Sequence, residues 1–300
     1  MSKLRLYPKV ARLFLGGHIV AGEDIANSYS LVSPGYEQWF LNTMHRYNDE
    51  MIGELSKHLD PSQSLQILDL AAGTGYNAQA MQGLFPASRL TLVDISPGML
   101  KEARQNLGED VSLITSDMLN YLANCADNTF DVVICAWAIK YRNPLHVIRH
   151  CHRVLKPGGY LAVIVNTKDT LPQVARIYPQ LLARHVPKIT KLMLPLPNPR
   201  DLAAFDGWFR KYSFTKIKSQ KGFQDFIFPT SRELAEFIVS TGALAGFDVM
   251  LDLRDPAVFA DLVQLLADHH FTGTTHRYVY GIYQKLSCSQ RNLRRRKANE

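Results

Sequence analysis

Short apolar runs recur between residues 65 and 165, and small or polar residues follow each run. Runs of this kind without strict alternation are typical of parallel strands that are buried on both faces. Segments with helical periodicity separate the runs, so the chain predicts an α/β fold with a doubly wound, Rossmann-like sheet. The runs lie at residues 65–70, 89–94, 111–114, 130–136 and 160–165.

The first run leads from Asp69 into a turn of small residues that opens a predicted helix. Small residues let the backbone approach a ligand closely, and the N–H groups at a helix start are free to bind it. The turn also fits a dinucleotide fingerprint, but the Asp69 carboxylate would repel a pyrophosphate. It suits a ligand that has an ammonium group and no phosphate. The residues expected to bind this ligand are Asp69, Ala71, Gly73 and Gly75.

Acidic residues also follow the next two runs. Asp94 ends the second run at about the separation expected for a carboxylate that accepts both hydroxyls of a ribose. Ser96 then predicts a helix N-cap, with Pro97 in the first turn. Asp117 follows the third run, where it can accept hydrogens from the amino group of an adenine. The further expected cofactor contacts are Asp94, Ile95, Met99, Asp117, Met118, Cys135 and Trp137, of which Met118 and Trp137 are also compatible with core packing.

The order of these motifs resembles that of the class I methyltransferases that use S-adenosyl-L-methionine (SAM), and the resemblance covers about residues 60–168. It implies a seven-stranded sheet whose last strand is antiparallel, with SAM as the cofactor. The pattern Asp-x-Ala-x-Gly-Thr-Gly at residues 69–75 is similar to that of the ubiquinone and menaquinone C-methyltransferases.

Two other segments are also similar to that family. Residues 25–29, Ile-Ala-Asn-Ser-Tyr, match its Ile-Ala-x-x-Tyr-Asp segment, with Ser30 in place of the aspartate. Its Phe-Gly-x-Arg-Asn run corresponds to Trp-Ala-Ile-Lys-Tyr at residues 137–141. The SAM methyltransferase resemblance implies in-line displacement at the sulfonium methyl. The candidates to orient or deprotonate the acceptor are Tyr29, Tyr36, Lys140 and His185.

The chain is expected to form one structural domain. Its parts are an N-terminal helical cap (1–62), a SAM-binding core (63–168), a lid insertion (169–228), a segment that completes the sheet (229–286) and a basic tail (287–300). The lid is apolar and punctuated by prolines, so it could line a pocket for an apolar acceptor. Residues 214–220 and 275–284 predict the last two strands, and residues 231–240 and about 257–267 predict helices.

The net charge of +7 includes +4 from residues 291–300, so the basic excess is not spread over a nucleic-acid-binding face. Nucleic acid is therefore not an expected partner. The four cysteines form no Cys-x-x-Cys pair, which fits a reducing cytoplasm and predicts no metal site. The basic N-terminal segment is amphipathic and too short to span a bilayer. Together with the basic tail it is compatible with peripheral membrane contact.

These observations favour SAM-dependent methyl transfer to a small, lipophilic acceptor. Two alternatives stay open. The first is a SAM-fold enzyme that acts on a soluble metabolite or uses SAM for other chemistry. The second is a cofactor-binding assembly protein without catalysis.

Overall fold

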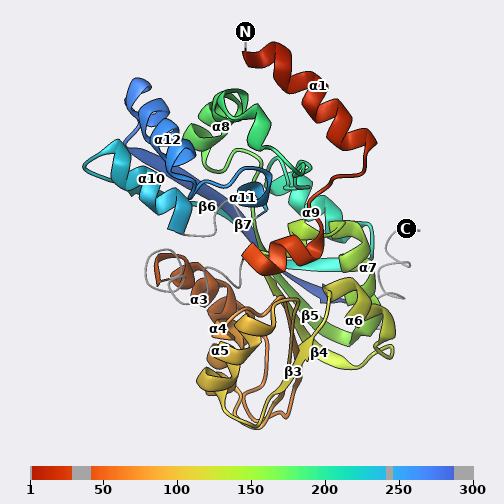
Figure 1. Ribbon diagram of the computed structural model, residues 1–300. Coiled ribbons are helices and arrows are strands. Elements are labelled where there is room, and N and C mark those ends of the chain that lie inside the picture. The colour runs from red at the N-terminus through yellow and green to blue at the C-terminus, as the bar shows by residue number, and fades with distance from the viewer. Residues whose placement is uncertain (1, 29–41, 241–245, 287–300) are drawn as a thin grey trace, which may run out of the picture. The chain divides into compact units, whose positions relative to one another are not determined.

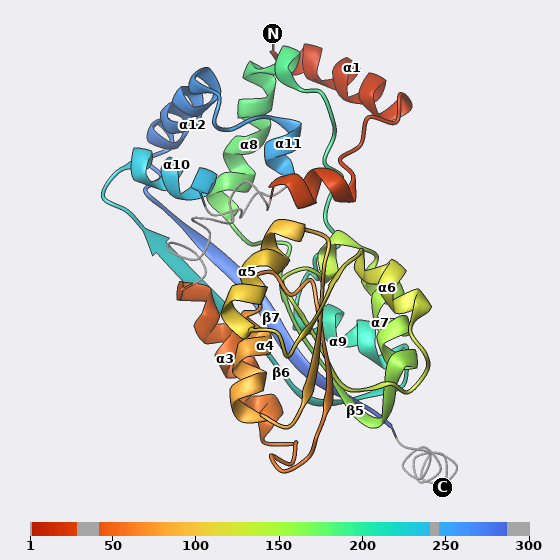
Figure 2. The same cartoon turned by 60° about the horizontal axis from the view of Figure 1, so that its bottom comes forward.

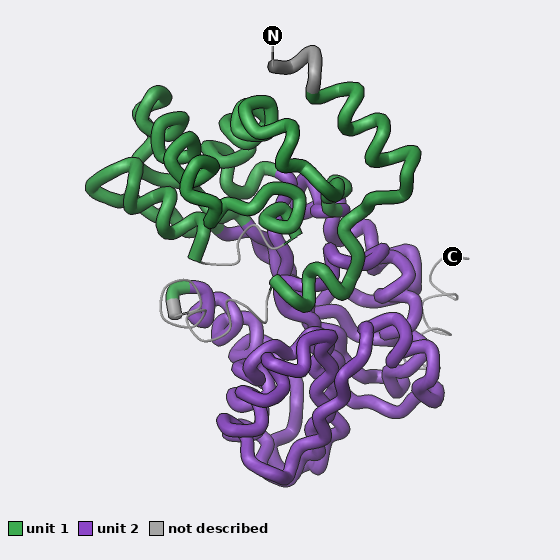
Figure 3. The backbone as a smooth tube through the Cα atoms, viewed as in Figure 1, with its two compact units in different colours: residues 1–43, 169–196, 223–277 green, residues 44–168, 197–222, 278–300 purple. Residues whose placement is uncertain are grey.

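A computed structural model describes residues 2–28, 42–240 and 246–286 (Figure 1). Tyr29 and Tyr36 lie outside the described residues, as does the basic tail. The chain forms two compact units (Figure 3). Unit 1 comprises residues 1–43, 169–196 and 223–277, and unit 2 comprises residues 44–168, 197–222 and 278–300. The expected parts do not coincide with these units, because the cap is divided after residue 43 and the lid after residue 196.

The described strands form one seven-stranded sheet in the order β3-β2-β1-β4-β5-β7-β6. The pairs β1–β2, β1–β4, β2–β3 and β4–β5 are parallel, whereas β5–β7 is antiparallel. The expected doubly wound sheet with an antiparallel last strand is thus confirmed. The strands are β1 (Gln66–Leu70), β2 (Arg89–Asp94), β3 (Ser112–Thr115), β4 (Phe130–Ala136), β5 (Leu155–Asn166), β6 (Phe214–Ile227) and β7 (Gly273–Lys285).

Helices cover both faces of the sheet in unit 2 (Figure 2). On one face lie α4 (Tyr76–Leu84) and α5 (Pro97–Leu107), and α3 (Asn42–Ser56) joins α4 there through a stack of His45 on Tyr76. The other face is covered by α6 (Met118–Asn124), α7 (Pro144–Val154) and α9 (Leu202–Arg210). A short 3-10 helix, η2 (Ile139–Tyr141), follows β4.

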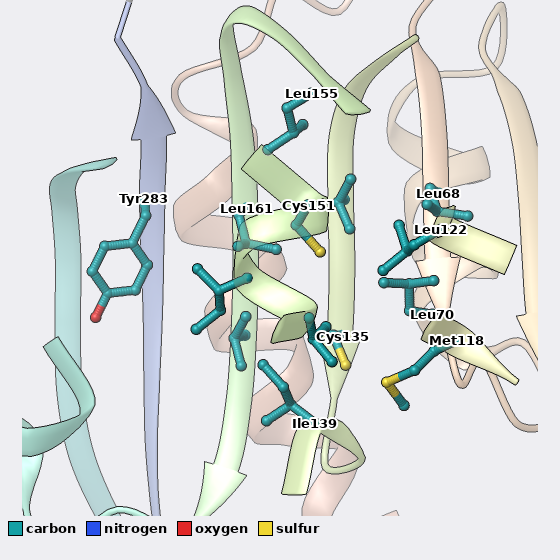
Figure 4. Close-up of a cluster of buried hydrophobic side chains, with 14 of the residues drawn as sticks. Leu68, Leu70, Met118, Leu122, Cys135, Ile139, Cys151, Leu155, Leu161 and Tyr283 are labelled. Carbon is teal, nitrogen blue, oxygen red and sulfur yellow. The ribbon is translucent and has the colours of Figure 1, made fainter. Parts of the chain in front are cut away.

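The hydrophobic core of unit 2 lies between the sheet and α6, α7 and α9 (Figure 4). Because side chains alternate along a strand, Leu68 and Leu70 of β1 enter this core while Asp69 between them points to the opposite face. Phe209 of α9 stacks on Tyr283 of β7 with 3.6 Å between ring centroids. The aromatic residues of α9 therefore belong to the core of unit 2, although the sequence placed them in the lid.

Unit 1 is helical apart from the parts of β6 and β7 that run into it. In it α8 (Pro172–Arg184) packs against α1 (Ser2–Leu15) and α12 (Pro256–Asp268), and α12 packs against α10 (Ser231–Ser240). Unit 1 also contains the shorter helices η3 (Val186–Lys188) and α11 (Phe247–Met250), and residues 22–28 are helical. Both helices expected after the lid are confirmed as α10 and α12. None of the described helices has the length and apolarity needed to cross a bilayer.

Candidate cofactor and acceptor site

The turn after β1 has the backbone of a close-approach loop. Ala71, Gly73 and Gly75 all have positive φ, at 55°, 57° and 86°. A Cβ on Gly75 would lie 2.7 Å from Leu107 Cδ1, so packing and φ both require glycine there. A Cβ on Gly73 would have no atom within 4 Å among the described residues. The turn therefore presents bare backbone on its Gly73 side.

Asp94, at the end of β2, holds this turn in place. Its Oδ2 accepts a hydrogen bond from the Gly73 N–H at 2.9 Å, and its Oδ1 accepts one from the Ser96 N–H at 2.8 Å. Burial raises the pKa of Asp94, and the backbone hydrogen bonds oppose this rise. Ser96 in turn accepts from the Met99 N–H, which confirms Ser96 as the N-cap of α5. The carboxylate expected to bind a ribose is thus preorganised by two backbone donors.

Asp69 is the most unusual group of the site. It is 1% exposed, and neither carboxyl oxygen has a hydrogen-bond partner within the described part of the chain. Burial, and next the charge of Asp94, raise the pKa of Asp69 to about 8, although the nearby Asn77 amide and Ala78 N–H act in the opposite direction. An orphaned buried carboxyl is destabilising unless a cation or donor pairs with it. It fits the ammonium group of SAM, as the sequence predicts.

Asp117, after β3, is engaged by protein groups. Its Oδ1 caps α6 by accepting from the N–H groups of Leu119 and Asn120. Its Oδ2 lies 2.6 Å from Nε of Arg142, an ion pair that the sequence analysis missed because the two residues lie in different loops. An adenine amino group would share this carboxylate with Arg142. The remaining expected contacts near these turns are half-buried Ile95 and the buried Met99 and Met118.

Cys135, an expected cofactor contact, has its side chain in the core of unit 2. Cys135 pairs with Leu70 in the β1–β4 register, and its side chain is fully buried in the core that faces α7 (Figure 4). Burial raises the pKa of the thiol. Strand alternation thus directs this side chain away from the face on which Asp69 lies.

Trp137, after β4, is bound into a network that the sequence did not reveal. It has a positive φ of 62°, and its indole Nε1 donates to Asn48 Oδ1 at 2.8 Å. The Asn48 amide donates to Asn77 Oδ1 at 2.9 Å. Asn48 and Asn77 are both buried, and Asn77 lies beside Asp69. These hydrogen bonds connect the turns after β1 and β4, where the strand order reverses and α/β sheets bind ligands.

The indole also belongs to a cluster of aromatic rings. The Tyr278 ring lies 5.6 Å from Trp137 in an edge-to-face arrangement and 4.4 Å from Tyr47. Tyr278 pairs with Asn166, the last residue of β5. Asn166 is buried, and its Oδ1 has no hydrogen-bond partner among the described residues. The carboxyl end of β5 thus combines flat apolar surfaces with an unused acceptor.

Lys140, in η2, is buried with 7% of its surface exposed. Its Nζ lies 5.3 Å from the centre of the Tyr141 ring and forms neither an ion pair nor a hydrogen bond with any described residue. Burial lowers the pKa of Lys140 to about 8. A lysine with this pKa can exchange a proton near neutral pH, which an arginine at the same position could not do.

Comparison with known proteins is consistent with this geometry. Residues 67–159 match the family model of a methyltransferase domain. The chain is 33% identical over 143 residues to the demethylmenaquinone methyltransferase of Corynebacterium kroppenstedtii, which covers 47% of this chain and 59% of that protein. It is 32% identical over 136 residues to a ubiquinone/menaquinone biosynthesis C-methyltransferase of Hydrogenovibrio crunogenus, covering 42% and 52%. The chain thus spans less than two thirds of each of these relatives.

The likeness to solved structures concerns the fold. The YcgJ protein of Bacillus subtilis superposes with a TM-score of 0.52 at 17% sequence identity. The superposition covers 80% of this chain and 99% of that chain.

Proposed function

We propose that this chain, which belongs to the class I SAM-dependent methyltransferases, transfers the SAM methyl group to a small apolar acceptor. The family, the enzyme class and the cofactor expected from the sequence are confirmed by the methyltransferase-domain match and by the relatives. The observation that carries the proposal is the buried carboxyl of Asp69, which has no hydrogen-bond partner among the described residues. It lies beside Asn77, which is hydrogen-bonded through Asn48 to Trp137 after β4.

The cofactor half of the proposal assigns one role to each turn. Asp69 and the backbone of Gly73 would hold the ammonium end of SAM, and Asp94 the ribose. Asp117 and Met118 would hold the adenine. Bound SAM supplies a methyl group that its sulfonium charge already activates. The protein then contributes position and exclusion of water, because the leaving group needs no further activation.

The acceptor half rests on Trp137, Tyr47, Tyr278 and Lys140. The three rings offer flat apolar surface for a ring-bearing acceptor. Neutral Lys140 can take the proton that such an acceptor loses when it becomes nucleophilic. The names of the two relatives, which concern menaquinone and ubiquinone, support an acceptor of the quinone class. Tyr29 and Tyr36 remain further candidates to orient it.

The test is incubation of the full chain with methyl-labelled SAM and separated polar and lipid extracts. We expect label in the lipid products. We expect none with Asp69→Asn, because the ammonium group loses its counter-ion. Lys140→Met should lower turnover strongly, whereas Lys57→Met should not, since Lys57 is an exposed lysine on a helix end. Label confined to water-soluble products would contradict the acceptor class. SAM binding without label in either extract would contradict methyl transfer.

A further inference from the structure

One face of α1 exposes large apolar side chains. Tyr7 is 73% exposed, Phe14 59% and Leu15 85%. With exposed Ala11 they occupy positions i, i+4, i+7 and i+8, so they follow one side of the helix. We call these four residues the α1 stripe. Contiguous exposed apolar surface on a helix indicates an interaction site rather than chance.

A neighbouring side of α1, about 100° around the helix from the stripe, already anchors the helix to unit 1. Leu13 is buried, and Leu6 and Val10 are half-buried at the same helical spacing. Through this side α1 packs against α8 and η3. The stripe therefore lies on the side of an anchored helix that does not serve this packing. A change in the stripe should leave the fold of unit 1 intact.

Charge indicates what the α1 stripe contacts. The helix sequence contains Lys3, Arg5, Lys9 and Arg12 and no acidic residue. A second copy of the chain would bring two such basic helices together, and the net charge of +7 on each chain opposes this. An anionic surface complements the helix instead. Aromatic and aliphatic side chains flanked by basic residues are the composition of helices that lie in a bilayer interface.

We propose that α1 docks this protein onto an anionic membrane surface, with Tyr7, Phe14 and Leu15 inserted at the headgroup level. The positive charge of the helix would add attraction to anionic headgroups. Such binding is reversible and weakens with salt, because it combines a shallow apolar contact with screened charge. The proposal does not depend on the identity of the methyl acceptor, and its test does not measure methyl transfer.

The experiment is co-sedimentation of the full chain with vesicles of phosphatidylcholine alone or with about one third phosphatidylglycerol. We expect binding to the anionic vesicles only. The double variant Phe14→Ser, Leu15→Ser should lower the partition coefficient by at least about tenfold. Its matched control is Phe223→Ser, Ile227→Ser, which removes two apolar side chains of β6 that are 63% and 80% exposed. This control should bind like the wild type.

A third variant, Lys9→Gln with Arg12→Gln, should reduce the preference for anionic vesicles. Circular dichroism and SAM binding should be unchanged in all three variants. The proposal is overturned if the wild type binds neither vesicle, or if the stripe variant binds as well as the wild type. It is also overturned if light scattering shows a dimer that the stripe variant abolishes, or if the chain binds soluble poly-glutamate but not vesicles.

Discussion

Replacing Lys140 by methionine should stabilise the folded protein while it lowers turnover. Lys140 is buried and has no ionic partner among the residues that the structure describes, so below its pKa the folded state holds a desolvated charge. Methionine retains most of the apolar stem and carries no charge. The same substitution removes the group that we propose accepts a proton from the acceptor. Stability and activity should therefore change in opposite directions.

The size of the stabilisation follows from the pKa of Lys140, which burial lowers from 10.5 to about 8. At about 1.4 kcal/mol per pKa unit, the buried charge destabilises the folded state by roughly 3 kcal/mol at pH 7. A small cavity left by methionine offsets about 1 kcal/mol of this. We therefore expect the free energy of unfolding to rise by about 2 kcal/mol in Lys140→Met at pH 7.

The effect should depend on pH with a definite sign. Below pH 8 the folded and unfolded chains both bind the lysine proton, so the full difference is present. Between about 8 and 10.5 the unfolded chain binds more protons, and the stability of the wild type rises by up to about 1.4 kcal/mol per pH unit. The advantage of the variant should shrink over this range, vanish within it and then reverse, because only the cavity cost of about 1 kcal/mol remains once Lys140 is neutral in both states.

The assay is urea denaturation of both proteins at pH 7 and at steps up to pH 10, followed by tryptophan fluorescence and circular dichroism. Lys285→Met is the matched control. Lys285 is equally buried, but it donates to Asn128 Oδ1 and to the Leu155 carbonyl. That substitution should destabilise the protein, because it leaves both acceptors unpaired. A Lys140→Met protein that is less stable than the wild type at pH 7, or whose difference is the same at every pH, would refute the reasoning.

Three further predictions concern the site. SAM binding at pH 7 should release a proton, because a cation near Asp69 favours ionisation of a carboxyl whose pKa is about 8. The buffer takes up this proton, so calorimetric binding heats in phosphate and in Tris should differ. Identical heats in the two buffers would contradict the role of Asp69. Asp94→Ala should weaken SAM binding and lower the free energy of unfolding, each by about 1–3 kcal/mol, because the Gly73 and Ser96 N–H groups lose their acceptor. A loss of binding with unchanged stability would show that the turn does not need Asp94. Gly222→Ala should destabilise the protein by about 1–3 kcal/mol and lower turnover, because the added Cβ would lie 2.3 Å from Tyr278 Oη. Its control is Gly83→Ala, whose Cβ would have no atom within 4 Å in the described chain. In thermal melts this control should be neutral or stabilising.

Local features of the chain were sufficient to predict the strands, the helix start and the turn that surround the site. The apolar runs predicted strands β1 to β5, and Ser96 with Pro97 predicted the start of α5. The small residues around Gly73 predicted the turn after β1, whose positive φ angles the structure shows. These features were predictable because propensity, periodicity and capping depend on residues within a few positions of one another.

The sequence could not predict the side-chain contacts between these elements. Asn48, Asn77 and Trp137 form one network although they lie in α3, in α4 and after β4. The pairing of Arg142 with Asp117 and the core position of Phe209 likewise depend on how distant segments pack. Burial of Lys140, and with it the lowered pKa, also arises only from packing.

The sequence by itself therefore determined which strand ends carry acids and where the backbone turns tightly. Only the tertiary structure decided which of those acids stay unpartnered. Asp69 and Asp117 look alike in the sequence, but folding buries the first with no hydrogen-bond partner in the described part of the chain, and it gives the second a helix to cap and an arginine to bind. The physical reason is that hydrogen bonding and desolvation depend on neighbours in space, which the order of residues does not specify.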